Sequence, residues 1–166
     1  FEELPCKDQE LSFETLYHKL KECIQLETFN QDTLKTLNLY DNNNGYNNAA
    51  GILADKNHFP GIDIMKFGEN INIIQRRATF ENMSILEVYD KTINIFRDYY
   101  QYEVIEGADR KKVEKIPEAA FREAVANALI HRVWDIETRI RILMFDDRIE
   151  IISPGGLPSG ITEEEY

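Results

Sequence analysis

The sequence predicts an α+β fold, a small mixed sheet packed with helices, and two patterns in its 166 residues support that class. Apolar residues recur three or four positions apart in several segments, which is the period of an amphipathic helix. Shorter runs of alternating or continuous apolar residues, bounded by Gly, Pro, Asn or Asp, indicate strands. The helical segments are 12–26, 83–100 and 117–132, and the clearest strands are 61–67, 138–145 and 148–152.

The first half of the chain is predicted to pass from helices to strands. After the first helix, Asp32 is placed to cap a short second helix that ends at Leu37. The Asn-rich run 41–45 is typical of a loop, and the short apolar runs that follow predict strands of one small sheet. These expected strands are 49–54, 61–67 and 71–74, with a hairpin turn at 68–70.

The second half is predicted to alternate helices with hairpins. Asn82 or Ser84 is available to cap the long helix, and Pro117 suits the first turn of the next one. Between these helices, 102–105 and 112–116 are expected to pair as strands. In the final hairpin, isoleucines at alternate positions are expected to share one buried face. They are Ile140, Ile142, Ile149 and Ile151.

Composition excludes some classes of function. The net charge of −11, from 30 acidic and 19 basic residues, repels a phosphate backbone, so this segment is not expected to be the main DNA-binding surface. Arg76-Arg77 and 110–112 are candidate basic patches, with solvated surface charge as the alternative. No apolar run approaches a membrane span. Cys6 and Cys23 are interpreted as reduced thiols of a cytoplasmic protein, without a zinc site.

The helix at 117–132 carries the residues best suited to chemistry. Glu123, Asn127 and His131 are four residues apart, so they fall within one stripe of about 80°. A second polar stripe, formed by Glu118, Arg122 and Arg132, lies on nearly the opposite side. Because a surface helix needs only one wet face, the first stripe is a candidate lining of a cleft. The alternative is that both stripes are solvated surface, or that His131 caps the helix.

Two motifs, 117–132 and 147–162, resemble the C-terminal region of bacterial RecG-related helicases and transcriptional regulators, in the same order and at the same separation. That region is similar in turn to the GHKL class of ATPases, which includes histidine kinases and gyrases. The helical N-box of that class reads Glu, three residues, Asn-Ala, and Glu123 and Asn127-Ala128 match it. The resemblance implies that the small mixed sheet continues into a truncated GHKL-like α/β sandwich.

The resemblance also implies roles for individual residues. Asn127 would bind the magnesium ion (Mg) that bridges the phosphates of ATP, because Mg prefers hard oxygen donors and keeps several waters. Glu123 would be the catalytic residue that positions or activates a water. The remaining cofactor-binding positions are His131 and the turn that takes the place of the glycine box, where glycines let the backbone approach a nucleotide. The turn residues are Ser153, Gly155 and Gly156.

The sequence departs from the family pattern at three places. Ser153 stands where an adenine-reading Asp is expected, and Val133-Trp134-Asp135 replaces the usual continuation of the His-Arg pair. The sequence also ends at Tyr166, before the lid and second glycine region that would close on a triphosphate. We therefore expect that this segment alone does not hydrolyse ATP efficiently.

The expected organisation is an α+β connecting subdomain at 1–81 followed by the first part of the GHKL-like module at 82–166. The earlier segment also resembles this family, although less specifically, at 1–5, 33–39, 47–53 and 66–67. The resemblance implies a longer parent protein, with a Schlafen/AlbA-type DNA-binding domain upstream and often a winged helix downstream. DNA would be contacted through those domains, and a homodimer is the other expected partner.

Three functional hypotheses remain open at this point. The chain is the sensor or dimerisation core of a transcriptional regulator with a degenerate nucleotide pocket, or a true Mg-dependent ATPase module of a helicase-related protein, or a structural linker. Helicase activity itself has no motif behind it, because the sequence lacks the phosphate loop Gly-x-x-x-x-Gly-Lys-Ser/Thr. The burial and bonding of Asn127 discriminate between a linker and a binding site.

Overall fold

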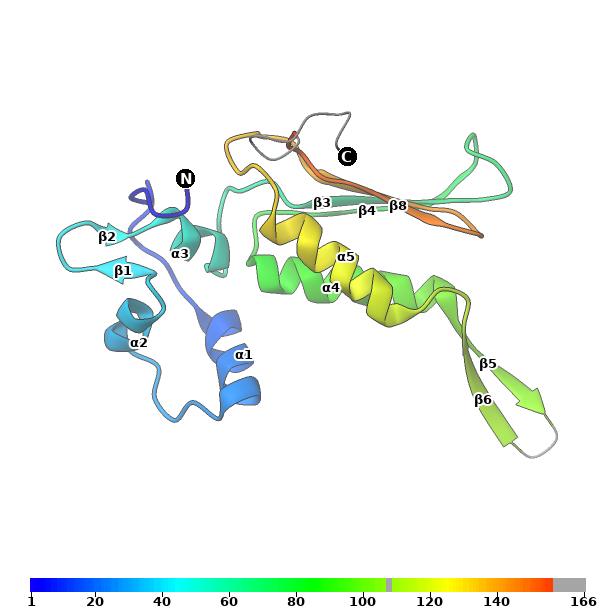
Figure 1. Cartoon of the computed structure of the whole chain (residues 1–166), viewed down its shortest axis with the longest axis horizontal. Coiled ribbons are helices and arrows are strands. Elements are labelled where there is room, and N and C mark those ends of the chain that lie inside the picture. Colours follow the sequence, from blue (N-terminus) through cyan, green and yellow to red (C-terminus); the bar gives the residue numbers. More distant parts are fainter. Residues whose placement is uncertain (107–108, 157–166) are drawn as a thin grey trace, which may run out of the picture.

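The computed structural model describes residues 1–106 and 109–156, and it confirms an α+β fold (Figure 1). The N-terminal part holds small elements around a core of Phe13, Leu16 and Leu34. A β-hairpin between two of its helices is only two residues long on each side. The elements are α1 (Glu14–Ile24), α2 (Gln31–Thr36), β1 (Tyr40–Asp41), β2 (Gly45–Tyr46) and α3 (Asn48–Leu53).

Helix α3 corrects the strand predicted at 49–54. The side chain of Asn47 accepts a hydrogen bond from the Ala50 N–H at 3.0 Å, so it caps the first turn of a helix. A Cβ added at Gly51 would lie 2.8 Å from the Cys6 sulfur, which explains why this buried turn needs small residues. An apolar run of six residues fits a buried helix as well as a strand, and here the cap decides.

The N-terminal cap of α2 also differs from the prediction. Asn30, not Asp32, is the cap: its side chain accepts from the N–H groups of Asp32 and Thr33, at 3.0 and 3.1 Å. Thr33 bonds back to the Asn30 N–H and completes a capping box. Asp32 instead lies in the first turn, where it pairs with Lys35.

A four-stranded mixed sheet forms the centre of the C-terminal part. Its order is β4-β3-β7-β8, in which β3 and β7 are parallel neighbours and the other pairs are antiparallel. Strands from both sides of residue 81 therefore share one sheet, which crosses the expected subdomain boundary. The strands are β3 (Ile62–Phe67), β4 (Ile74–Phe80), β7 (Ile140–Met144) and β8 (Ile149–Ile152).

Strand β4 begins where the predicted strand 71–74 ends. Residues 71–73 belong to the turn, which the Gly68 N–H closes on the Ile73 carbonyl at 2.8 Å. The strand itself starts with Ile74, Gln75, Arg76 and Arg77, all exposed, and β4 is an edge of the sheet. An edge strand of this composition lacks the apolar alternation on which sequence analysis depends.

Two helices, α4 (Ile85–Tyr100) and α5 (Glu118–Ile130), cover one face of this sheet (Figure 1). Ile140 and Ile142 are fully buried between sheet and helices, and Ile149 and Ile151 pack against the same core, as predicted. The Phe96 ring stacks on the rings of Tyr100 and Phe121, with ring centroids 5.2 and 4.4 Å away. Helix α4 is capped by Ser84, which decides between the two predicted caps.

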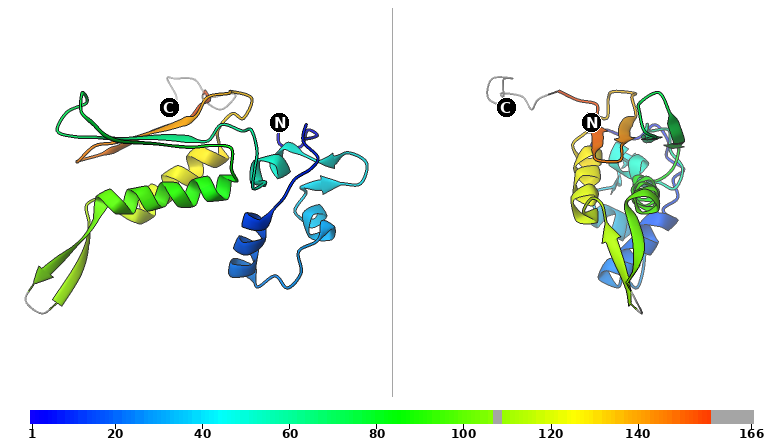
Figure 2. Two further views of the ribbon diagram at one scale, coloured as in Figure 1. Left: turned by 180° about the vertical axis from the view of Figure 1, so that it is seen from behind. Right: turned by 90° about the vertical axis from the view of Figure 1, so that its right-hand side faces the viewer.

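A two-stranded arm projects from the far end of α4 (Figures 1 and 2). It consists of β5 (Gln101–Glu106) and β6 (Asp109–Glu114), which pair antiparallel. The pairing was predicted, but the second strand spans 109–114 instead of the expected 112–116. Two of its apolar side chains face solvent: Tyr102 is 46% exposed and Ile105 is 70% exposed. No helix within 1–106 and 109–156 is long and apolar enough to cross a membrane.

The stacked ring of Phe96 is predicted to be a main source of stability. Replacing Phe96 by Ala removes a fully buried ring between two others and should lower the free energy of unfolding by about 3–5 kcal/mol. Ile24→Ala is the control, because Ile24 is 63% exposed, and should change it by less than about 0.5 kcal/mol. Denaturant unfolding of both variants measures this, and equal effects would contradict the packing described.

Candidate functional site

Helix α5 is held against α4 by its buried residues and by its supposed second polar stripe. Phe121, Val125 and Leu129 form the buried line, four residues apart. Glu118 accepts from Arg97 of α4 at 2.5 Å, and Arg122 donates to the Tyr89 hydroxyl at 3.1 Å. The second polar stripe is therefore not simply solvated: two of its members bond to α4.

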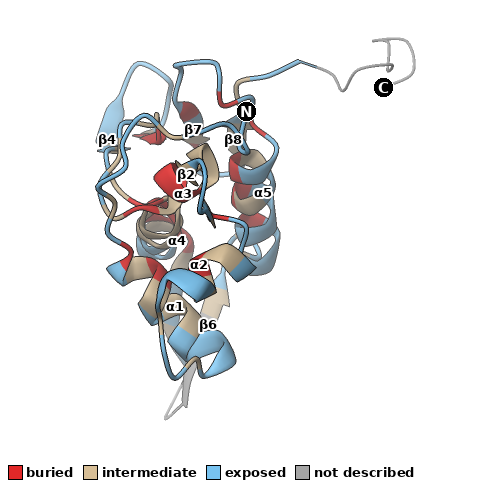
Figure 3. Ribbon diagram, turned by 90° about the vertical axis from the view of Figure 1, so that its left-hand side faces the viewer, coloured by how far each residue is buried: buried red, intermediate tan, exposed pale blue. Residues whose placement is uncertain are grey.

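The first polar stripe, Glu123, Asn127 and His131, lies on the exposed side of α5. Figure 3 shows how much of the outward side of α5 is exposed. Among the described residues, neither the Glu123 carboxylate nor the Asn127 amide has a hydrogen bond or ion pair. His131 is the C-terminal cap residue, but its backbone does the capping, because its N–H donates to the Asn127 carbonyl at 2.9 Å. These three side chains are thus available to a ligand or to water.

The turn that begins at Ser153 is fastened to the C-terminal end of α5. The Ser153 hydroxyl donates to the Ala128 carbonyl at 3.0 Å, next to Asn127. One residue further, the Pro154 carbonyl accepts from the Val133 N–H at 3.1 Å. The structure thereby brings the predicted glycine corner to the end of the predicted N-box helix, although the last part of that motif, 157–162, lies outside the described residues.

Gly155 allows this close approach. Its φ is +147°, a conformation that side chains with a Cβ rarely adopt, and an added Cβ would meet the Val133 side chain at 3.2 Å. Gly156 has open space in the same position and is exposed. Only the first of the two glycines is therefore required by the packing of the turn.

Arg132 is the member of this region that sequence analysis assigned wrongly. It was expected on a polar stripe, but only 3% of it is exposed, and its guanidinium lies 4.5 Å from the centre of the Trp134 ring. Burial lowers its pKa, because the charged form loses hydration. A signal did exist: Arg132 follows Leu129 by three residues, which is the position where the buried line would continue if the helix did not end at Ile130.

The described residues offer no site at which protein side chains alone would hold a metal ion. Residues 1–106 and 109–156 contain no group of three or more His, Cys, Asp or Glu side chains arranged to hold a metal ion. A single amide such as Asn127 suits magnesium only in a different mode, in which phosphate oxygens and water supply the other ligands. The unpartnered, exposed amide of Asn127 fits that mode.

Two cavities of the structure lie apart from this stripe. One of 560 Å³ is in the N-terminal part and is lined by residues between Glu2 and Ala49. A much smaller one, of 10 Å³, lies between α3, α4 and the end of α5, with Asn57 and Trp134 among its lining residues. Neither includes a residue of the predicted site.

Comparison with known proteins gives a family similarity for the last 30 residues of the sequence, 137–166. Residues 137–166 match the family described as "Putative ATP-dependent DNA helicase recG C-terminal". The match includes β7, β8 and the turn at 153–156, and it begins after Glu123, Asn127 and His131. This stretch is therefore similar to a RecG-type C-terminal region. The comparison with curated proteins gave no match.

A solved structure then extends the likeness in fold to almost the whole chain. It is the crystal structure of the DIP2311 protein from Corynebacterium diphtheriae, with a TM-score of 0.80 and 24% sequence identity. The similarity covers 99% of this chain but only 35% of that one, so the present chain spans about a third of its length. The likeness establishes a shared fold.

The two glycines of the turn should respond differently to the same substitution. Gly155→Ala forces a Cβ into a strained conformation and against Val133, and should lower the free energy of unfolding by about 1–3 kcal/mol. Gly156→Ala is the matched control and should change it by less than about 0.5 kcal/mol. Thermal or denaturant unfolding measures both. If Gly155→Ala is as stable as its control, the turn is not packed on Val133 as described.

Proposed function

We propose that this chain is the nucleotide-binding core of a RecG-related transcriptional regulator, in which it acts as a sensor and dimerisation unit. The observation that carries the proposal is the attachment of the glycine turn to the end of α5, through the carbonyl of Ala128, the residue that follows Asn127. The side chains of Glu123 and Asn127 on the same helix support it, because they are exposed and have no bonding partner among the described residues. The family similarity of residues 137–166 supports it as well.

The proposed ligand is ATP or a related nucleotide with magnesium. Bound magnesium would neutralise phosphate charge, which an acidic chain cannot do by itself. Asn127 would supply a side-chain oxygen to the metal, and Glu123, one turn earlier, would orient a water. Gly155 and Gly156 would let the backbone of the turn come close to the nucleotide.

The residue at position 153 favours nucleotide sensing over rapid ATP hydrolysis. Ser153 stands in place of the adenine-reading carboxylate, and its hydroxyl hydrogen already bonds to the Ala128 carbonyl. The Ser153 oxygen is then only a weak hydrogen-bond acceptor for the adenine amino group, so adenine would be held less specifically than by an Asp.

A true ATPase remains the second candidate because the Glu123 carboxylate is exposed and unpartnered among the described residues. Magnesium-dependent phosphate release that Glu123→Gln abolishes would favour this candidate over the sensor.

Removing the amide of Asn127 should weaken nucleotide binding. We expect the Kd of Mg-ATP for the full-length protein to rise at least about tenfold in Asn127→Ala, because one metal ligand is lost. Asn94→Ala is the control, since Asn94 is an exposed asparagine of α4, and should bind as the unaltered protein does. Calorimetric titration measures all three proteins. Equal affinity in both variants would mean that the N-box motif is inert.

The arm supports the dimerisation role. A two-stranded ribbon is marginal by itself in water, and this one leaves both outer edges unpaired and two apolar side chains exposed. Ile105, at 70% exposure, is the most exposed of the large apolar residues in the described part of the chain. A second copy of the chain would cover this surface. Contacts with DNA are proposed only for domains outside this segment.

Charging the arm should therefore weaken self-association. Ile105→Asp is expected to raise the dimer dissociation constant by about tenfold or more, as is common for a residue central to an interface. Ile24→Asp serves as the control, because Ile24 is also highly exposed but lies on α1. Sedimentation equilibrium of the full-length protein measures the change. If Ile105→Asp dimerises as tightly as the unaltered protein, the arm is not part of the dimer interface.

A further inference from the structure

Arg132 is a buried cation with an unusual set of partners. Its guanidinium donates to three backbone carbonyls: Pro60 at 2.8 Å, Ile136 at 3.0 Å and Thr138 at 2.8 Å. Its Nε is buried and has no hydrogen-bond partner. No carboxylate lies within ion-pair distance of it among residues 1–106 and 109–156. Within the described residues, the hydrogen bonds of Arg132 therefore all go to backbone carbonyls.

These carbonyls belong to the two segments that lead into the central strands. Pro60 comes two residues before β3, and Thr138 comes two residues before β7. The same segments are joined by the Ile140 N–H, which donates to the Gly61 carbonyl at 3.0 Å. Since a guanidinium presents several donors in one rigid plane, a single side chain can fix both segments relative to the end of α5.

The next residue connects this clamp to the proposed nucleotide site. The Val133 N–H bonds to Pro154, and the Val133 side chain packs where Gly155 leaves room. Arg132 thus fixes the backbone immediately before Val133, and Val133 in turn holds the glycine turn. Displacing Arg132 would move the support of the turn without altering any residue that faces the ligand.

We infer that Arg132 is a positioning residue, which fixes the turn at 153–156 against the end of α5 and thereby sets the geometry of the ligand site. The expected effect of Arg132 on nucleotide binding rests on the proposed function. Its role in holding the turn against α5 does not. A lysine at this position would keep the charge and lose the planar set of donors. A methionine would keep most of the apolar stem and lose every hydrogen bond.

Hydrogen exchange of single amides tests the structural part in the full-length protein without any ligand. The Val133 N–H is bonded to the turn, while the Val88 N–H is bonded to Ser84 within α4 and serves as the internal reference. In Arg132→Met, Val133 should exchange at least about tenfold faster relative to Val88, and in Arg132→Lys by a smaller factor of about three. Arg122→Met, which alters an exposed arginine within α5, should leave this ratio unchanged.

The outcomes separate this inference from the proposed function. A ratio that stays within twofold in both Arg132 variants, or a uniform acceleration of both amides, overturns the inference, because the residue then contributes only general stability. If Arg132→Met does not fold, Arg132→Lys alone decides by the same ratio. Titration with Mg-ATP is the second readout: weaker binding that Arg132→Lys partly restores supports positioning. If the unaltered protein binds no nucleotide while the ratio still changes, the proposed function fails and the positioning role of Arg132 stands.

Discussion

The parallel pairing of β3 with β7 is the constraint on which the rest of the structure depends. It joins Ile62 to Ile140 and so brings segments from distant parts of the sequence into one sheet. Parallel neighbours require a long crossover, and the intervening residues supply it as α4, the arm and α5. At the start of this pairing Gly61 is indispensable, because an added Cβ would lie 1.8 Å from the Phe80 carbonyl oxygen.

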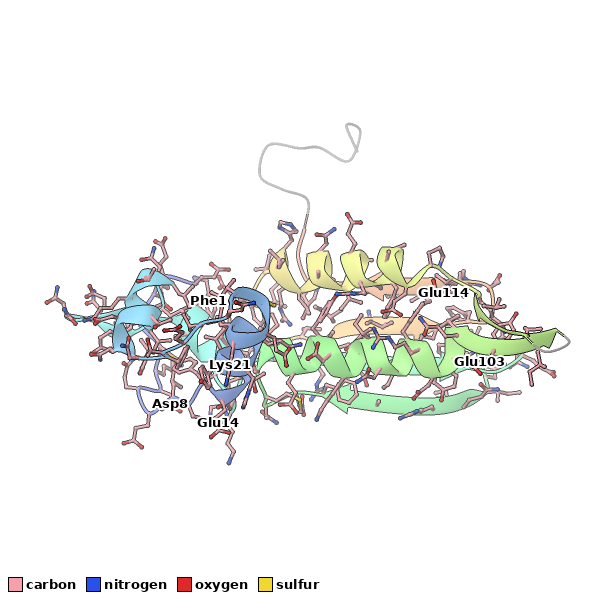
Figure 4. The ribbon with its side chains drawn as sticks, turned by 90° about the horizontal axis from the view of Figure 1, so that it is seen from below. Phe1, Asp8, Glu14, Lys21, Glu103 and Glu114 are labelled. Carbon is pink, nitrogen blue, oxygen red and sulfur yellow. The ribbon has the colours of Figure 1, made fainter. Side chains whose placement is uncertain are left out.

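Helix α5 links this scaffold to the candidate site. Its buried line packs on α4, which runs beside it in Figure 4, and on the sheet. Its end is held through Arg132, and its exposed side carries Glu123 and Asn127. The residues that stabilise the helix are therefore different from those available to a ligand.

Much of the fold was predictable because local signals agreed with tertiary packing. The alternating isoleucines of the last hairpin and the helical period before Tyr100 are both confirmed. The failures have physical causes. The stretch 49–54 has no periodicity of its own, so only the Asn47 cap makes it a helix, and β4 is an exposed edge strand with too few apolar residues.

The candidate site was predictable only in part. The spacing of Glu123 and Asn127 was readable from the sequence, whereas the attachment of Ser153 to Ala128 is a tertiary contact that no local pattern contains. The burial of Arg132 was missed because arginine is ordinarily exposed. Here three carbonyls and the Trp134 ring make a buried arginine stable.

The exposed side of α5 and the glycine turn are proposed to form one nucleotide site. Nitrogen-15 NMR spectra of the full-length protein with increasing Mg-ATP test it most directly. If the two form one site, the signals of the Asn127 side-chain amide and of the backbone at 153, 155 and 156 shift together with one dissociation constant, while the signal of the Asn94 side chain does not move. Signals that do not move, or that move only around the 560 Å³ cavity of the N-terminal part, would contradict it.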